Sequence, residues 1–323
     1  MSESVETIPR RWRRRGRIFP AEGRRLPAWL SGYAALPYPV PCGDGHRVRV
    51  YFSGRDSENR SSIGAVTVDL RTLAVEEGSL TEEPLLRPGS LGAFDDSGVT
   101  VSCIVSHRER LHLYYTGWIL GRTVPFYFAV GLAVSEDGGR SFERWSPAPV
   151  LDRHATDPYL CASPSILVEG GRWRMWYVSG KLWEQRPEGP RHHYLVRSAK
   201  SADGIHWHRD GGVALDFAGP QEYAIGRPHV VRHCGEYHMW FCSRGDRYRL
   251  GRARSPDGDR WTRDEDTVTL EPTPAGWDGD MQAYPAVLRQ EGRWWLFYNG
   301  NGYGASGFGI AEGIPGGGGE DRG

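Results

Sequence analysis

The sequence has no long apolar segment and no excess of charge of either sign. No run of about 18 apolar residues occurs among its 323 residues, which excludes a membrane-spanning helix. Six arginines stand between Arg10 and Arg17, but the apolar segment that a secretory signal needs does not follow them. We therefore expect a cytoplasmic protein that does not bind membranes.

Basic and acidic residues balance, with 40 of each. A nucleic-acid binder that neutralises many phosphates needs a basic surplus, so we expect no nucleic-acid partner. The cysteines number only five and never form a Cys-x-x-Cys pair, and the histidines form no tight triad. We expect reduced structural thiols, no metal and no cofactor.

Helical periodicity is also missing, whereas turn-forming residues are abundant. The chain has 43 glycines and 22 prolines, and aromatic residues make up 12% of it. This composition favours many short strands that are joined by tight turns, and it makes an α/β fold improbable.

A repeat of about 57 to 64 residues runs through the chain. Its clearest element is an aromatic strand that ends in a small or polar residue. The central rings of its five copies are Tyr51, Tyr114, Trp176, Trp240 and Phe297. A fixed period of this length is typical of repeat folds, including propellers.

Each copy contains further shared elements. An aliphatic stretch that follows Leu36-Pro37, Ser97-Gly98, Ser163-Pro164, Arg227-Pro228 or Tyr284-Pro285 precedes the aromatic strand, and a strand of small residues follows it. Three copies then carry an Asp-Gly turn, at Asp137, Asp203 and Asp257. Asp and Gly suit tight turns, so we assign these three acids to structure.

The repeat predicts an all-β fold, a five-bladed β-propeller with four antiparallel strands per blade. We expect a basic N-terminal arm over residues 1–29, the propeller over 30–312 and a Gly-rich disordered tail over 313–323.

Chemically varied residues gather at one predicted face of the propeller, before each first strand and after each second strand. Aromatic rings, arginines and acids recur there, a mixture that suits a sugar ring and its hydroxyls. The candidate substrate-binding residues are Arg55, Asp56, Arg60, Trp118, Lys181, Trp183, Arg227, Arg244, Asp280, Tyr284, Asn299 and Tyr303.

The x-Pro-x-aliphatic strands, the Met-Trp-Tyr segment at 175–177 and the Asp-Gly-x-x-Trp turns resemble the five-bladed β-propeller glycosidase superfamily. This group includes the arabinanase and β-xylosidase, invertase and levansucrase, and mannoside phosphorylase families. The resemblance covers residues 30 to 312. It implies a glycosidase, that is, a glycoside hydrolase or a related glycosyl-transferring enzyme of carbohydrate metabolism, with a small-molecule carbohydrate substrate.

The superfamily commonly carries an Asp directly before the blade proline, but this chain has Leu36, Ser163, Arg227 and Tyr284 there. Other acids lie nearby, and glycoside cleavage needs two carboxyl groups about 5 to 9.5 Å apart. We predict Glu222 as proton donor, Asp96 as base or nucleophile and Asp157 as a supporting carboxylate.

Arg227 begins a strand that is predicted to line the channel, and arginine pairs well with carboxylate or phosphate. The substrate is therefore predicted to be a small glycoside, anionic or nucleoside-linked. Two alternatives stay open at this point: a non-catalytic carbohydrate-binding propeller, and a biosynthetic enzyme for cyclisation or elimination on the same scaffold.

Overall fold

The computed structural model describes residues 8–21, 26–264, 270, 273 and 275–314. Within these residues the regular structure is β-strand, apart from two short 3₁₀-helices, η1 (Ala28–Leu30) and η2 (Asn301–Gly304). No helix in the described ranges has the length and apolarity that crossing a bilayer requires.

Antiparallel pairing divides the described strands into five groups, of which the first four are consecutive in the sequence and the fifth includes the N-terminal strand. Group 1 comprises β2 (Gly32–Pro41), β3 (Arg47–Arg55), β4 (Ser61–Asp69) and β5 (Ala74–Val75). Group 2 comprises β6 (Gly98–His107), β7 (Arg110–Leu120), β8 (Phe126–Ser135) and β9 (Glu143–Arg144). Group 3 comprises β10 (Cys161–Glu169), β11 (Arg172–Arg186), β12 (Gly189–Ser201) and β13 (Val213–Leu215). Group 4 comprises β14 (Ala224–His233), β15 (Glu236–Arg244), β16 (Tyr248–Ser255) and β17 (Thr262–Arg263). Group 5 comprises β18 (Ala283–Gln290), β19 (Arg293–Asn299), β20 (Phe308–Ile314) and β1 (Arg11–Phe19).

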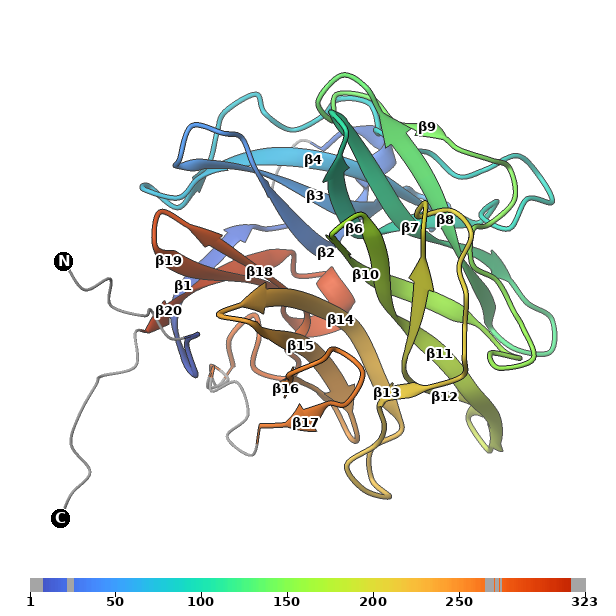
Figure 1. The fold of residues 1–323 in the computed structure, drawn as a ribbon. Coiled ribbons are helices and arrows are strands. Elements are labelled where there is room, and N and C mark those ends of the chain that lie inside the picture. Colours follow the sequence, from blue (N-terminus) through green and yellow to red (C-terminus); the bar gives the residue numbers. More distant parts are fainter. Residues whose placement is uncertain (1–7, 22–25, 265–269, 271–272, 274, 315–323) are drawn as a thin grey trace, which may run out of the picture.

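The first strands of groups 1 to 5 surround a common centre (Figure 1). Contacts run from β2 to β6, then to β10, β14 and β18, and from β18 back to β2. Single parallel residue pairs, Ser61 with Gly98 and Tyr194 with Ala224, join groups 1 and 2 and groups 3 and 4 into larger sheets. The first strands thus form a closed cycle, and their ends can direct side chains at one central space.

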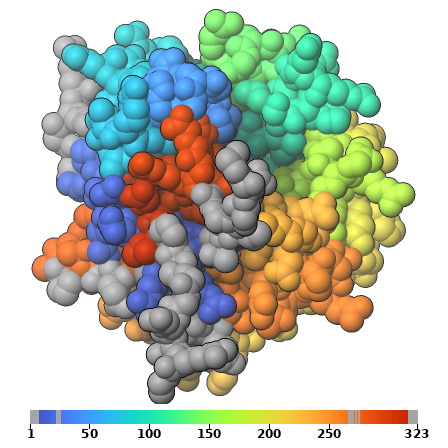
Figure 2. All heavy atoms as spheres, turned by 60° about the vertical axis from the view of Figure 1, so that its left-hand side comes forward, coloured from blue at the N-terminus to red at the C-terminus, as the bar shows by residue number. Residues whose placement is uncertain are grey.

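The N-terminal strand β1 belongs to the last group. It pairs with β20 from Arg11 opposite Ile314 to Phe19 opposite Phe308, and Figure 2 shows N-terminal and C-terminal atoms side by side. Part of the segment expected as a basic arm is therefore an outer strand. Of the expected tail, Gly313 and Ile314 lie in β20, and residues 315–323 lie outside the described residues.

The aromatic strands of groups 1, 2 and 3 each contact the Asp-Gly turn of the next group. The Tyr114 hydroxyl donates to the Gly204 carbonyl over 2.7 Å, and Trp176 Nε1 donates to the Gly258 carbonyl over 2.8 Å. In each case the ring and the turn belong to neighbouring groups. Burial of such a large ring stabilises the fold by roughly 1.5 to 3 kcal/mol, and the hydrogen bond fixes its direction.

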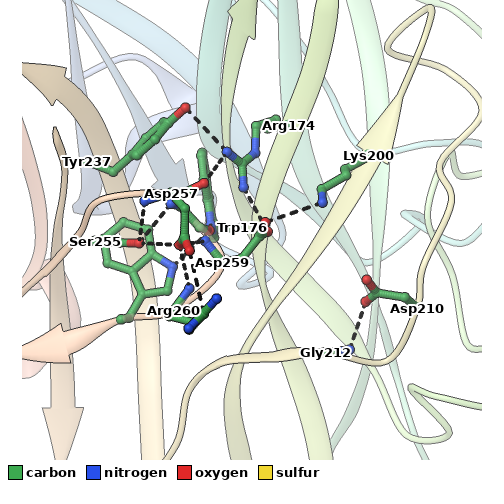
Figure 3. Close-up of polar contacts among 12 residues, drawn as sticks. Arg174, Trp176, Lys200, Asp210, Gly212, Tyr237, Ser255, Asp257, Asp259 and Arg260 are labelled. Atoms are coloured by element: carbon green, nitrogen blue, oxygen red, sulfur yellow. Dashed lines mark hydrogen bonds and ion pairs between the residues drawn. The ribbon is translucent and has the colours of Figure 1, made fainter. Parts of the chain in front are cut away.

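The turn between Ser255 and Arg260 shows how the acid holds such a turn (Figure 3). Asp257 Oδ1 accepts the backbone N–H groups of Asp259 and Arg260, both over 2.9 Å, while Arg174 of group 3 donates to the Asp257 carbonyl. These contacts lie in the turn and between two groups, and they agree with a structural assignment of Asp257.

Candidate functional site

A central cavity of about 490 Å³ is lined by residues of the first, second and third strands and of the loops that connect them. Most of its lining is apolar or aromatic, and three arginines and one histidine supply its ionisable nitrogen groups. Its lining residues are Leu36, Arg55, Asn59, Thr100, Thr116, Trp118, Leu120, Pro125, Phe126, Phe128, Leu160, Ala162, Ser163, Val178, His192, Tyr194, Gly226, Arg227, Arg244, Tyr248, Tyr284 and Tyr303. None of them is Asp or Glu.

A bulge in four first strands builds one wall of this cavity. Leu36, Ser163, Arg227 and Tyr284 each precede a proline, each has a φ between 46° and 58°, and each lines the cavity. A left-handed conformation at a residue other than glycine costs about 1 to 2 kcal/mol. Strain of this kind often persists at functional sites, because it directs side chains that a regular strand would place elsewhere.

Group 2 differs from the other groups at this point. We expected Ser97-Gly98 to match the four residue-proline pairs, but the structure places the irregularity of β6 between Val101 and Cys103. Gly98 instead pairs with Trp118, at the end of β7. In group 2 the position that corresponds to the residue-proline pairs therefore lies four residues later in the sequence than predicted.

Arg227 is a buried cation with no carboxylate partner among the described residues. Its guanidinium, on a residue that is only 1% exposed, donates to the carbonyls of Val101 and Leu36, and its Nε has no hydrogen-bond partner. Burial lowers the pKa of Arg227 to about 10, so the group stays charged at neutral pH. An unpaired buried charge is unfavourable unless an anion neutralises it.

Arg55 and Arg244 are held by neutral groups instead of acids. Arg55 donates to Asn59 Oδ1 over 2.7 Å and lies 4.6 Å from the centroid of the Tyr33 ring. Arg244 lies among the rings of Tyr223, Tyr248 and Tyr303, at 5.4 to 5.8 Å. In the described part of the chain neither forms a salt bridge, so their charges are available to a ligand.

The remaining polar groups of the cavity include one imidazole and several hydroxyls. Burial, with a smaller contribution from Arg244, lowers the pKa of His192 to about 4. The hydroxyls of Tyr194 and Tyr248 contact each other, and burial raises the pKa of both phenols. The cavity therefore combines three positive charges with phenol, hydroxyl and imidazole groups.

Carboxylates occur instead in four clusters farther out in groups 2 to 5. In each cluster an acid that precedes the first strand pairs with an arginine from a segment close to the outer strand, beside a ring of the second strand. We call these clusters the acid clamps. Their members are Asp95 with Tyr115 and Arg144, Asp157 with Tyr177 and Arg209, Glu222 with Phe241 and Arg263, and Asp278 with Tyr298 and Arg14.

Asp157 and Glu222, two of the predicted catalytic acids, are clamp members and do not line the cavity. Asp157 has no exposed surface and accepts hydrogen bonds from Ser179 and Tyr177 at 2.6 and 3.0 Å. Both oxygens of Glu222 accept from Arg263, at 3.1 and 2.7 Å. The prediction that both acids lie at the mouth of the channel is wrong, because their carboxylates are hydrogen-bonded to side chains of their own strand groups.

Asp96, the third predicted acid, borders a smaller space that we call the side cleft. This cleft has a volume of about 400 Å³ and shares Asn59, Trp118 and Leu120 with the central cavity. Its other lining residues are Glu58, Arg60, Gly89, Leu91, Asp96 and Ser97. Asp56, another predicted binding residue, does not line the cleft, and its carboxylate accepts a hydrogen bond from Arg60 over 3.1 Å.

The other predicted binding residues divide into two sets. Arg55, Trp118, Arg227, Arg244, Tyr284 and Tyr303 all line the central cavity. The second set, Lys181, Trp183, Asp280 and Asn299, is not part of the cavity lining. Lys181 pairs with exposed Asp216, and Trp183 packs against Phe126. The backbone of Asp280 contacts Asn301 and Arg249, and Asn299 is buried. Asn299 supports the site from behind, because its Oδ1 accepts the N–H of Leu36 over 2.7 Å.

Several cavity residues were missed by the sequence analysis. Thr100, Thr116, Phe126, Phe128 and Tyr194 lie within strands, where their spacing resembles that of core residues. Only the unusual density of rings between Phe126 and Phe128 distinguishes this stretch of the sequence. Membership of the cavity depends on strand ends and bulges, which hydrophobic patterns do not define.

Comparisons with known proteins agree with this fold. No family model matches the chain. The Mycobacterium tuberculosis protein Rv1502, described as an uncharacterized protein, is 43% identical over 300 residues, which cover 93% of this chain and 98% of that protein. A solved structure described as a glycoside hydrolase superposes with a TM-score of 0.73 at 17% identity, over 97% of this chain and 93% of that one. A thermostable family-43 glycoside hydrolase gives a TM-score of 0.64 at 15% identity, over 86% and 87% of the two chains. The chain thus belongs to the family of Rv1502, and it has the fold of these glycoside hydrolases, as the sequence resemblance predicted.

Proposed function

We propose that this protein binds an anionic sugar derivative in its central cavity, with a carboxylate or phosphate group between Arg55, Arg227 and Arg244. The observation that carries the proposal is that three guanidinium groups line one cavity whose lining includes no Asp or Glu. Arginine pairs with both anion types through two parallel hydrogen bonds. The likeness of the fold to glycoside hydrolases supports a carbohydrate as the rest of the ligand.

The arrangement of the strand groups around the central cavity is also part of this proposal. We interpret the five strand groups as five blades of four strands, with the cavity at one end of the central channel. The closed cycle of contacts among the first strands supports this interpretation. A central cavity shared by five blades lets residues far apart in the sequence, such as Arg55 and Arg244, contact one ligand.

Binding measurements test the proposal. In titration calorimetry we expect methyl β-glucuronide or glucose 1-phosphate to bind at least tenfold more tightly than neutral methyl β-glucoside. We expect Arg244→Gln to remove most of this difference. Arg293→Gln is the matched control, because Arg293 is exposed and pairs with Glu312 outside the cavity. Equal affinity of all three sugars for the wild-type protein would refute the proposal.

Glycoside cleavage is a second candidate function, and the side cleft favours it. Glu58 and Asp96 line this cleft, and Trp118 forms part of both spaces. A glycosidic bond over Trp118 would have these two carboxylates on one side and the arginines on the other. An acid and a base or nucleophile are the groups that such cleavage requires.

The cleavage test uses 4-nitrophenyl β-glucuronide and the wild-type protein with and without inorganic phosphate. If cleavage occurs, Asp96→Asn and Glu58→Gln should each reduce kcat by about 10² or more, while Glu222→Gln should leave it unchanged. Binding of the glucuronide without any release of nitrophenol would leave binding as the function and exclude cleavage of this substrate.

A further inference from the structure

Two leucines at the side cleft are unusually exposed. Leu91 is 99% exposed and Leu120 is 71% exposed, and both line the cleft. Single exposed leucines are common on protein surfaces, but two beside one tryptophan at a cleft form an apolar patch. The patch adjoins the central cavity, since Trp118 and Leu120 line both spaces.

The loop that carries Leu91 is fixed by hydrogen bonds. Asp96 Oδ2 accepts the N–H of Gly92 over 3.0 Å, and Asp96 Oδ1 accepts the Ser97 hydroxyl over 2.9 Å. The oxygen of the same Ser97 hydroxyl accepts the N–H of Leu120 over 3.2 Å. Asp96 thus fixes the backbone next to Leu91 directly and the backbone of Leu120 through Ser97, so both residues are positioned beside the cleft.

The charges of the two spaces differ in sign. The side cleft contains Glu58 and Asp96, and its one cation, Arg60, pairs with Glu58 over 3.0 Å. The lining of the central cavity contains arginines and no acid. An anionic group is therefore attracted to the cavity and repelled by the cleft, which orients a ligand that occupies both.

We propose that the anionic sugar carries an apolar aglycone, an alkyl chain or an aryl ring, which lies in the side cleft against Leu91, Trp118 and Leu120. This inference depends on the proposed function of the central cavity. In this arrangement Leu91 and Leu120 determine specificity for the aglycone, and Asp96 is a positioning residue for both.

The experiment compares two acidic pairs and one neutral pair by titration calorimetry below micelle-forming concentrations. The acidic probes are methyl and hexyl β-glucuronide, and methyl and hexyl phosphate; the neutral probes are methyl and hexyl β-glucoside. In at least one acidic pair we expect the hexyl compound to bind about tenfold more tightly than the methyl compound, because the chain buries apolar surface. The double variant Leu91→Ser/Leu120→Ser should lose this tenfold gain and keep the affinity for the methyl compound.

Leu182→Ser is the matched control, because Leu182 is also exposed but borders neither space. Equal affinities of hexyl and methyl compounds in both acidic pairs would overturn this inference and leave the proposed function intact. A gain from the hexyl chain that survives in the double variant would also overturn it. If no acidic probe binds more tightly than its neutral counterpart, the proposed function fails and this inference fails with it.

Discussion

The acid clamps and the central cavity distribute charge in opposite ways. In each clamp a carboxylate that is at most 12% exposed is paired with an arginine, so the charges are neutralised within one strand group. In the cavity, Arg227 is 1% exposed and has no carboxylate partner among the described residues. Position within the group separates the two roles: ion pairs in the clamps hold strands together, whereas the arginines at the centre have no acid in the cavity lining and are the proposed partners of a ligand anion.

The largest expected effect comes from breaking a clamp. Asp157→Ala removes the partner of Arg209 and the acceptor of Ser179 and Tyr177. We expect the free energy of unfolding to fall by about 3 to 5 kcal/mol, because a partly buried cation loses its counter-ion. Urea denaturation measures this loss. Asp152→Ala, at an acid outside the clamps, is the control, and an equal loss in both variants would contradict the role given to the clamps.

Removal of the Arg227 guanidinium should reduce sugar affinity more than it reduces the free energy of unfolding. Arg227→Met deletes an unpaired buried charge, so we expect the free energy of unfolding to change by no more than about 1 to 2 kcal/mol. The affinity for methyl β-glucuronide should fall at least tenfold, and calorimetry at two salt concentrations should show a weaker salt dependence. Unchanged affinity together with a large loss of stability would make Arg227 a structural residue.

Acidification should destabilise the wall of the cavity. The pKa of His192 is about 4 in the folded protein and about 6.5 when unfolded, so the unfolded chain binds the additional proton below pH 6.5. Stability is therefore complete above pH 6.5 and falls as the pH decreases toward 4. His192 alone should account for about 1.5 kcal/mol between pH 6.5 and 5. Urea denaturation of His192→Phe should show a smaller loss over this range, and an unchanged pH profile would contradict the assignment.

The smallest effect is expected in the Asp-Gly turns. Asp137 accepts hydrogen bonds from Arg140 and Ser141 on an exposed turn. We expect Asp137→Ala to lower Tm by about 1 to 2 °C and to leave sugar affinity unchanged. Glu136→Ala, at the exposed neighbour, serves as the control in differential scanning calorimetry. A loss of affinity without a change of Tm would place this turn at the binding site.

The sequence predicted the all-β repeat and part of the site, and both follow from local rules. Aromatic strands, Asp-Gly turns and residue-proline pairs have fixed spacings, so Arg227 and Tyr284 could be assigned to the starts of inner strands. Trp118 and Tyr303 were found for a similar reason, because Trp118 lies near the end of a second strand and Tyr303 follows another. These residues all line the cavity.

The acids could not be placed from the sequence, because their positions depend on contacts over long distances in the chain. Arg209 is 52 residues from Asp157, and Arg263 is 41 residues from Glu222. Only the closed strand groups bring these arginines to the acids. A carboxylate before an inner strand therefore looks the same in the sequence whether it faces a ligand or an arginine of its own group.

The pairing of β1 with β20 has a consequence for synthesis of the protein. Arg14 and Asp278, joined by a salt bridge, are 264 residues apart, and β1 leaves the ribosome long before its partner strand exists. Closing a loop of this length is entropically unfavourable and slow compared with the hairpins inside each group. Groups 1 to 4 can assemble in order as the chain emerges, whereas group 5 is complete only after β20 has been synthesised. During this interval β1 and the edge of the incomplete group remain unpaired, and unpaired strand edges make a chain prone to aggregation.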